Sequence, residues 1–394
     1  MREGPYYPVF MENQEQTPQH NRQELDPPIT PLAPPVGVPP EKPSVRRADD
    51  PTIGARLDEL IAEVGGQPGS FNARMIRDLL TTGLKLIPDG RDTGELKLIT
   101  TAIKELRYAY RVFGQYAVPH KVSIFGSART PPGHPDYAAA RDFGRLMAEA
   151  GWMIITGAGD GIMKAGHEGP GRQASFGVAI RLPFETSAND VIAGDDKLIH
   201  FRYFFTRKLM FLSQAEAIAL FPGGFGTMDE AFEALTLIQT GKSSMIPIVM
   251  VEGKGETYWQ EFDAAMRQML LARSWINPED LSLYRMFNTP AEAVDHIVKF
   301  YRNYHSSRYV KDDLVIRLKR PLAQVDLDRL TDEFAILIKK SGAANGSPSK
   351  IVQRKPFEVE DDHLDLPRIS FPHTKYKFGL VRQLIDRINE CESV

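Results

Sequence analysis

The stretch that most constrains the fold runs from Ala215 to Glu230. It opens with the short apolar run Ala217 to Phe221, which is typical of a buried parallel strand. Pro222 has no N–H to donate and ends the strand. The glycines that follow permit positive φ and close approach of the backbone to another group; they are Gly223, Gly224 and Gly226.

A helix is predicted directly after these glycines. Thr227 is expected to cap it, with Asp229 and Glu230 in its first turn. Strand, glycine turn and helix start together present a row of backbone N–H groups, which suits a phosphate. The alternative is a tight strand-to-helix connection that binds nothing.

Composition limits the class of protein. The 394 residues include 42% hydrophobic and 25% charged residues, as in ordinary globular proteins. A formal charge of −3 gives no support to a nucleic-acid partner. Cys391 is the single cysteine, so neither a disulfide framework nor a thiolate metal site is expected. No apolar run approaches the length that spans a bilayer, and the N-terminus is unlike a secretory signal. We therefore expect a cytoplasmic protein.

Four regions follow from the pattern along the chain. Residues 1–50 are proline-rich with few aliphatic side chains, and they predict a disordered tail, with partner binding as the alternative. Residues 51–116 predict two or three amphipathic helices packed beside the main domain. Residues 117–305 alternate strands with helices, and helices are predicted from about Ile162 to Arg172, from Thr257 to Ala272 and from Pro290 to Tyr304. Residues 306–394 predict a small α+β region whose role the sequence does not decide. Its predicted strands are Leu314 to Leu318 and Ile351 to Phe357, and its last helix runs from about Phe378 to Asn389.

The alternating region predicts the fold class, which is α/β. Strands alternating with helices of this length indicate a Rossmann-like, doubly wound parallel sheet covered on both faces. In such a sheet, ligands bind beyond the carboxyl ends of the strands. Glycine-containing turns follow strands at residues 126–127, 157–161 and 223–227. These turns are therefore expected to share one binding crevice.

The spacing of the glycines excludes two common nucleotide-binding motifs. A dinucleotide fingerprint would place Gly-x-Gly-x-x-Gly after the first strand, and the turn there holds only Gly126. A phosphate loop of the type Gly-x-x-x-x-Gly-Lys-Ser/Thr does not occur. A nicotinamide cofactor and a phosphate-loop NTPase are accordingly not expected.

Charged residues near the glycine motif are candidates for chemistry. Arg207 and Lys208 precede the key strand on a predicted helix. A guanidinium can hold a phosphate or carboxylate through two parallel bonds, whereas Lys208 can equally be a solvated cation. Glu230 has two readings as well. It can complement the helix dipole, or it can project into the crevice as a general base or a charge facing a developing cation.

These motifs resemble those of the LONELY GUY (LOG) family. That family comprises cytokinin-riboside monophosphate phosphoribohydrolases and related bacterial nucleotide nucleosidases, which are often mislabelled lysine decarboxylases. Residues 222–230 match its Pro-Gly-Gly-x-Gly-Thr-x-x-Glu motif. Gly126-Ser127 resembles its Gly-Ser turn, and Gly159-Asp160-Gly161-Ile162-Met163 resembles its Gly-x-Gly-Leu/Ile-Met turn. Arg207-Lys208 matches its Arg-Lys pair. With all four motifs in the right order, the likeness covers about residues 120–304.

One position departs from the family pattern. Many members have His two positions before the Arg, where this chain has Phe205. The departure suggests a longer-chain bacterial-type subgroup, closer to broad nucleotide nucleosidases, and it weakens a specific assignment to cytokinin substrates.

The resemblance implies an activity and roles for residues. The activity is hydrolysis of the N-glycosidic bond of a nucleoside 5′-monophosphate to free base and ribose 5-phosphate, with no metal or organic cofactor and a dimeric or larger assembly. Arg207 and Glu230 are the implied catalytic pair. The remaining implied site residues bind substrate; they are Gly126, Ser127, Gly159, Asp160, Met163, Lys208, Gly223, Gly224, Gly226 and Thr227. Glu230 would face the oxocarbenium-like centre that forms as the base leaves.

Two other functions compete with hydrolysis. A nucleotide-binding or cofactor-carrier protein of the same fold would hold its ligand intact. Lysine decarboxylation would need pyridoxal phosphate on a lysine, and nothing in the sequence marks such a lysine.

Overall fold

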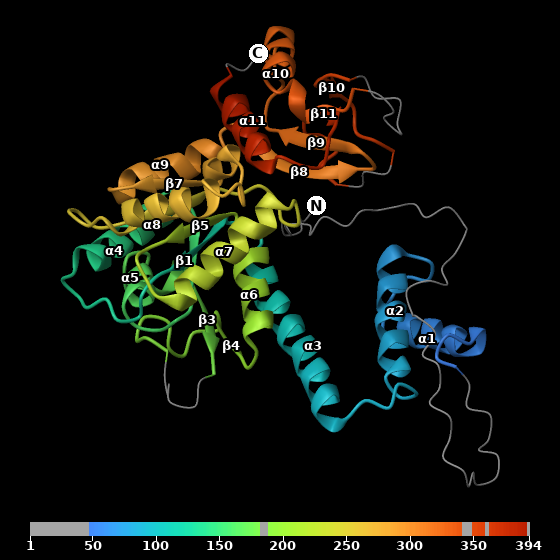
Figure 1. Cartoon of the computed structure of the whole chain (residues 1–394). Helices are drawn as coiled ribbons and strands as arrows, with labels where there is room; N and C mark the ends of the chain where they lie inside the picture. The colour runs from blue at the N-terminus through green and yellow to red at the C-terminus, as the bar shows by residue number, and fades with distance from the viewer. Residues whose placement is uncertain (1–46, 182–187, 341–348, 359–361, 392–394) are drawn as a thin grey trace. The chain divides into compact units, whose positions relative to one another are not determined.

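The computed structural model describes residues 47–181, 188–340, 349–358 and 362–391 (Figure 1). The predicted proline-rich tail thus lies, up to residue 46, outside the described residues. The described chain forms two compact units, one ending at Lys104 and the other beginning at Glu105. Among the described helices, none combines the length and apolar character needed to cross a membrane.

The first unit consists of helices. It contains α1 (Pro51–Glu63), α2 (Phe71–Lys85) and the start of α3 (Thr93–Phe113). Asp50 accepts a hydrogen bond from the Thr52 N–H, and Ser70 Oγ accepts one from the Ala73 N–H, so polar side chains satisfy the first turns. The predicted helices are therefore present. Their packing beside the main domain stays a prediction.

A seven-stranded parallel sheet forms the centre of the second unit, with the order β4-β3-β2-β1-β5-β6-β7. Its strands are β1 (Lys121–Phe125), β2 (Met153–Thr156), β3 (Ser175–Ile180), β4 (Leu198–Phe201), β5 (Ala217–Leu220), β6 (Ile248–Val251) and β7 (Tyr284–Phe287). All residues of β1, β2, β5 and β6 are buried, as expected for parallel strands covered on both faces. The predicted α/β fold class is confirmed.

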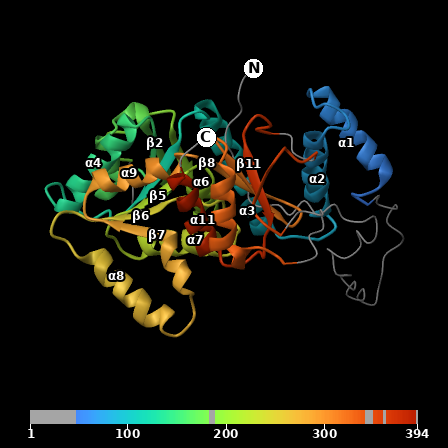
Figure 2. The ribbon, with the colours of Figure 1, turned by 90° about the horizontal axis from the view of Figure 1, so that it is seen from above.

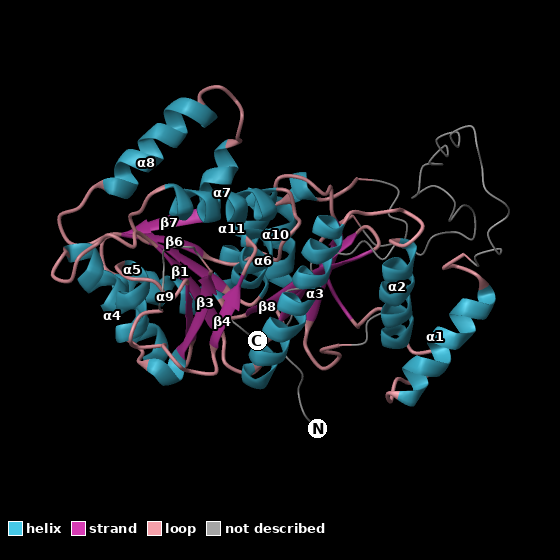
Figure 3. Ribbon diagram, turned by 90° about the horizontal axis from the view of Figure 1, so that it is seen from below, coloured by secondary structure: helices cyan, strands magenta, loops and turns pink. Residues whose placement is uncertain are grey.

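Helices cover both faces of this sheet. They are α4 (Pro135–Glu149), α5 (Ile162–Glu168), α6 (Phe204–Ser213), α7 (Phe225–Gln239), α8 (Tyr258–Met266) and α9 (Pro290–Phe300). α4 packs against α5 and α9, and Figure 3 shows these three on the side of the sheet opposite α6 and α7. In Figure 2, α8 stands out beside the edge strand β7.

Several predicted boundaries differ from the observed ones. The helix predicted from Ile162 to about Arg172 ends at Glu168, because Gly169, Pro170 and Gly171 follow and Gly171 adopts φ +73°. The helix predicted to reach Ala272 is regular only to Met266 and continues as a π-turn over Arg267–Leu271. The helix predicted to reach Tyr304 ends at Phe300.

The C-terminal region adds a four-stranded antiparallel sheet with the order β10-β11-β9-β8. Its strands are β8 (Tyr304–Val310), β9 (Asp313–Leu318), β10 (Val352–Arg354) and β11 (Arg368–Pro372), and its helices are α10 (Gln324–Glu333) and α11 (Phe378–Glu390). α11 packs against α7 and α9 of the larger sheet. Ser282 Oγ donates a hydrogen bond of 2.9 Å to the Gly379 carbonyl at the same junction. The sequence predicted β9, β10 and α11 but missed β8 and β11.

Candidate functional site

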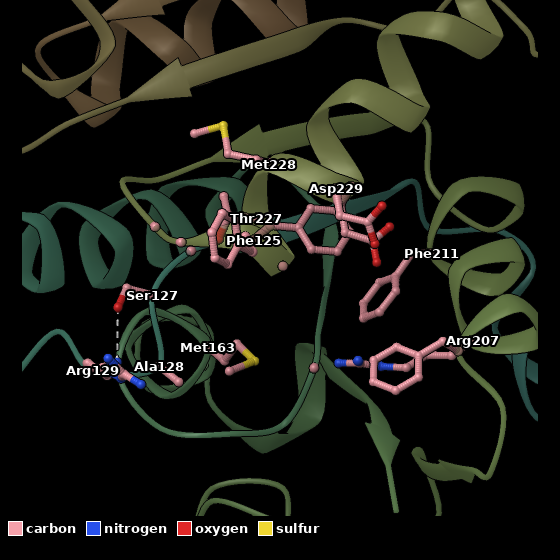
Figure 4. A pocket seen from close by; sticks show the side chains of 18 of the residues that line it. Phe125, Ser127, Ala128, Arg129, Met163, Arg207, Phe211, Thr227, Met228 and Asp229 are labelled. Carbon is pink, nitrogen blue, oxygen red and sulfur yellow. Dashed lines mark hydrogen bonds between the residues drawn. The ribbon is translucent and has the colours of Figure 1, made fainter. Parts of the chain in front are cut away.

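The candidate site lies where the strand order changes direction. β1 pairs with β2 on one side and with β5 on the other, although β5 comes much later in the chain. Beyond the carboxyl ends of these strands lies a cavity of about 830 Å³ (Figure 4). A crevice at such a switch point is the usual ligand site of an open parallel sheet. The turns after β1, β2 and β5 all contribute to its wall.

The glycine turn after β5 forms one side of the cavity. α7 begins at Phe225 with Gly224 as its N-cap, and no side chain caps it. The prediction that Thr227 caps this helix is therefore wrong, because the chain becomes helical before it reaches Thr227. Thr227 instead lies in the first turn, buried, and lines the cavity. Glu230 was predicted in the first turn, but it lies beyond that turn.

The glycines of this turn differ in the space that surrounds them. A Cβ on Gly223 would collide with the Thr227 side chain and come within 2.9 Å of the Ser127 nitrogen. A Cβ on Gly224 or Gly226 would meet nothing within 4 Å, although both residues line the cavity. The packing of the protein thus requires Gly223, whereas Gly224 and Gly226 leave open space at the helix N-terminus.

Ser127 joins the turns that surround the cavity. Its N–H donates to the Pro222 carbonyl at 3.0 Å, and its carbonyl accepts from the Ile162 N–H at 3.0 Å. Its Oγ accepts from the Arg129 N–H at 3.0 Å, the dashed line in Figure 4. The turns after β1, β2 and β5 are therefore tied together at one residue. Gly126 packs beneath it, since a Cβ there would collide with Ile162.

The turn after β2 contributes less of the wall than predicted. Met163 lines the cavity, whereas Gly159 and Asp160 do not, and Asp160 is exposed. Two residues of this turn have positive φ, Gly161 at +60° and Ala158 at +64°. A non-glycine residue in this region costs conformational energy and needs local support.

A buried polar network provides that support. His167 Nε2 lies 2.9 Å from Thr156 Oγ1 and 3.0 Å from the Phe176 carbonyl. Asn189 donates its backbone N–H to the Ala158 carbonyl at 2.8 Å and its side-chain amide to the Gly159 carbonyl at 3.0 Å. Burial lowers the pKa of His167 to about 4, so the imidazole is neutral at physiological pH. No pattern in the sequence predicted this network.

Arg207 and Glu230 both line the cavity, from α6 and α7. Arg207 Nε donates to the Val178 carbonyl at 2.8 Å, and its guanidinium carbon lies 5.1 Å from the centre of the Phe211 ring. Glu230 is only 7% exposed, and its Oε2 has no hydrogen-bond partner among the described residues. Burial raises the pKa of the Glu230 carboxyl to about 7, although Lys208 opposes the rise. A buried carboxylate with an unpartnered oxygen destabilises the folded state. Such groups occur most often at functional sites, where a ligand completes their contacts.

Lys208 does not line the cavity. Its Nζ lies 2.8 Å from Asp229 Oδ2 and 2.7 Å from Glu233 Oε2, and its side chain is 14% exposed. The amine is thus held by two carboxylates of α7, on either side of Glu230 in the sequence. The amine is therefore not a freely solvated cation, one of the two alternatives from the sequence, and its predicted contact with substrate stays a prediction.

Other residues of the cavity wall were missed by sequence reasoning. Tyr258, at the start of α8, donates its hydroxyl to the Gly223 carbonyl at 2.5 Å and so fixes the glycine turn. Arg129 adds a second guanidinium, and the aromatic rings of Phe204 and Phe225 are 55% and 97% exposed. Phe205, where many LOG proteins have His, does not line the cavity and stacks on Tyr203 at 5.5 Å. Of these residues, Phe225 alone could have been found from the sequence, because it lies between two glycines of the motif.

One group of side chains among the described residues has metal-binding geometry, and it lies outside the cavity wall. It consists of His134, Asp136 and Glu256. His134 Nδ1 accepts from the Asp136 N–H at 3.2 Å, and Asp136 Oδ1 accepts from the Gly253 N–H at 2.7 Å. These bonds cap α4 and join two loops, so a structural role accounts for the cluster.

Comparison with solved structures gives only distant likenesses. The molybdenum cofactor carrier protein of Chlamydomonas reinhardtii is 17% identical with a TM-score of 0.33, covering 46% of this chain and 97% of its own. The molybdenum cofactor binding protein of Rippkaea orientalis is 19% identical with a TM-score of 0.32, covering 46% and 96%. DNA processing protein A of Helicobacter pylori is 12% identical with a TM-score of 0.30, covering 48% and 83%. These likenesses carry no argument about function.

Comparison by sequence points to one family. No curated protein matches the chain significantly. A family model described as "Possible lysine decarboxylase" matches residues 158–297. This range contains the turn at Gly159 to Met163, the Arg207-Lys208 pair and the glycine motif through Glu230. The match supports the family resemblance that these motifs carry.

Proposed function

We propose that the protein hydrolyses the N-glycosidic bond of nucleoside 5′-monophosphates, giving free base and ribose 5-phosphate. The observation that carries the proposal is Glu230. The residue is only 7% exposed, its carboxyl group has an oxygen without a partner among the described residues, and it lines the same cavity as a helix N-terminus that no side chain caps. A phosphate-binding end and a buried carboxylate in one cavity fit a phosphorylated sugar.

The 5′-phosphate would bind at the start of α7. Gly224 and Gly226 leave open space at this helix end, and the helix dipole favours an anion. Ser127 and Thr227 add hydroxyl groups to the same wall, and Arg129 adds a positive charge. The phosphate would then hold the ribose across the cavity, with its anomeric carbon toward Glu230.

The reaction breaks the bond between C1′ and the base nitrogen. The electron pair leaves with the base, which takes up a proton, and C1′ becomes oxocarbenium-like. The ionised Glu230 carboxylate stabilises this positive charge and orients a water molecule. The water oxygen bonds to C1′, and one of its protons passes to Glu230, whose pKa of about 7 suits both protonation states. Solvent supplies the proton that the departing base takes up and accepts the proton from Glu230, so the net change is the addition of one water molecule across the bond. Arg207, fixed by the Val178 carbonyl and the Phe211 ring, positions the substrate beside it.

Lysine decarboxylation, the activity in the family model's description, fits this cavity poorly. Pyridoxal-phosphate chemistry of that kind needs a lysine that bonds to the cofactor. Of the described residues that line the cavity, none is a lysine. Lys208 directly follows the lining residue Arg207 in the sequence, but two carboxylates bind its amine.

The wider assignment is also proposed. The phosphoribohydrolase would belong to the longer-chain bacterial-type subgroup of the LOG family, act in the cytoplasm and assemble as a homodimer or larger homo-oligomer. Size-exclusion chromatography with light scattering measures the last of these directly.

The experiment is a panel of purine, pyrimidine and cytokinin nucleoside monophosphates, with free base measured by chromatography. Release of base from at least one of them, abolished in Glu230→Ala, supports the proposal. Tight binding of a nucleotide that is recovered intact after long incubation would favour the carrier function instead.

A further inference from the structure

Lys208 is surrounded by acidic side chains of the neighbouring helix. α6 presents Lys208 to α7, where its Nζ lies within 2.8 Å of Asp229 and 2.7 Å of Glu233. Burial acts to lower the pKa of Lys208, but hydrogen bonds to Asp229 and Glu233 raise it above its ordinary value. The amine is therefore charged, and it binds both carboxylates at once.

The two carboxylates flank Glu230 on the same helix. Asp229 precedes it directly, and Glu233 follows at i+3, which places Glu233 on the neighbouring turn. Three carboxylates within five residues repel one another, and each disfavours the charged form of the others. Asp229 lines the cavity together with Glu230, whereas Glu233 does not. The Lys208 amine offsets the charges of Asp229 and Glu233.

We infer that Lys208 is a positioning residue for the proposed reaction: by binding Asp229 and Glu233 it favours the ionised form of Glu230, without contacting the substrate. The inference rests on the proposed function for its catalytic meaning. Its physical content, the ionisation of one carboxyl group, can be measured without turnover.

The charged groups around Glu230 act in opposite directions. Burial raises the pKa of its carboxyl group most, Lys208 lowers it, and Glu233 raises it again, followed by Arg207, which lowers it, and Asp229, which raises it. Arg129 and Tyr258 line the same cavity from the β1 turn and α8. Removal of Lys208 therefore takes away the largest opposing effect and leaves two uncompensated carboxylates beside Glu230.

The first test is the pH profile of kcat/KM in Lys208→Met, which keeps the length of the side chain and removes its charge. We expect the acid limb to move to higher pH by about one unit, with activity largely restored at high pH. Lys208→Arg should keep the acid limb near its original position. Lys377→Met is the control. It removes an equally short ion pair, in which Lys377 Nζ of the C-terminal region lies 2.7 Å from Glu279 Oε1, and it should leave the acid limb in place.

A different role for Lys208 gives a different result. If its amine bound the substrate phosphate, Lys208→Met would raise KM at every pH and weaken inhibition by inorganic phosphate, with no shift of the limb. That outcome would overturn the inference.

The second test does not depend on activity. The Glu230 carboxyl carbon is followed by 13C NMR across pH, with Glu230→Gln used for assignment. We expect its titration to move upward by about one unit in Lys208→Met and back down when Asp229→Asn is added. An unmoved titration overturns the inference even if the enzyme is active. A shifted titration in a protein without turnover keeps the inference about ionisation and rejects the proposed function.

Discussion

The Glu105 carboxylate of α3 accepts a hydrogen bond of 2.6 Å from the Thr206 hydroxyl of α6. Its second oxygen accepts from the Arg202 N–H at 2.6 Å, just before the helix. α6 has no side-chain cap of its own at Tyr203. Glu105 therefore anchors the start of the helix that carries Arg207 and Lys208, and its negative charge favours the positive end of the helix dipole.

Replacement of Glu105 by Ala should loosen this helix end. We expect a loss of about 1.5–3 kcal/mol in unfolding free energy, the range of a lost hydrogen bond to a charged group. A severalfold fall in kcat/KM should accompany it, because Arg207 follows Thr206 directly. Denaturant titration and steady-state kinetics measure the two effects. Glu149→Ala breaks an exposed ion pair with Arg145 and is the control, expected to change neither. Equal effects of both substitutions would show that Glu105 does not anchor this helix end.

The glycines after β5 should respond differently to the same added methyl group. Gly223→Ala forces a Cβ into Thr227 and toward the Ser127 nitrogen, and it should cost about 1–3 kcal/mol of stability. Gly226→Ala adds a Cβ in open space within α7, and it should stabilise the helix by about 0.5–1 kcal/mol. Thermal unfolding distinguishes the two.

Gly226→Ala should nevertheless raise KM severalfold, since its methyl group enters the space proposed for the phosphate. A folded Gly226→Ala protein with unchanged KM would place the phosphate elsewhere in the cavity.

The sequence predicted the parallel sheet well because its strands are short, continuously apolar and bounded by glycine turns. Ala217 to Phe221 and Val122 to Phe125 show this pattern, and their burial confirms it. β8 was missed because Tyr304 to Val310 is mostly polar and half-buried. β11 was missed because Arg368 to Pro372 begins with an arginine and ends with a proline, although all its residues are buried.

The sequence predicted the cavity residues that lie in turns at strand ends, but not those that reach the cavity from neighbouring helices. Turns at strand ends reveal themselves by glycine, so Ser127, Met163 and Thr227 were found, and all line the cavity. Side chains that reach the cavity from a neighbouring helix carry no such mark. Tyr258 is one, and the partners of Lys208 on α7 are others. These contacts depend on how helices pack, which local pattern does not encode.

Arg129 supplies a positive charge at the β1 turn, and its contribution can be measured separately. Arg129→Gln should raise KM for a nucleoside monophosphate about 10- to 100-fold, the value of a charge-assisted hydrogen bond, with little change in kcat. Inorganic phosphate should also inhibit this variant less. Arg141→Gln, an exposed position on α4, is the matched control. A fall in kcat with KM unchanged would instead place Arg129 near the scissile bond.

Glu230 should show opposite effects on stability and activity. Its carboxyl pKa is about 7 in the folded protein, mainly through burial, compared with the ordinary value of 4.5. The folded state therefore binds the proton more tightly than the unfolded state. Stability is lost as the pH rises from about 4.5 through 7, at a cost on the order of 3 kcal/mol above that range.

Glu230→Gln removes this ionisation and keeps the shape of the side chain. We expect the variant to lose about 10²- to 10⁴-fold in kcat, as for a lost general base or charge. It should also be more stable than the wild type at pH 8 and nearly equal at pH 4, in unfolding experiments at both values. Glu149→Gln, an exposed position, should change neither property. A variant that is less stable at pH 8 would mean that the ionised carboxylate has a structural partner and is not held ready for a substrate.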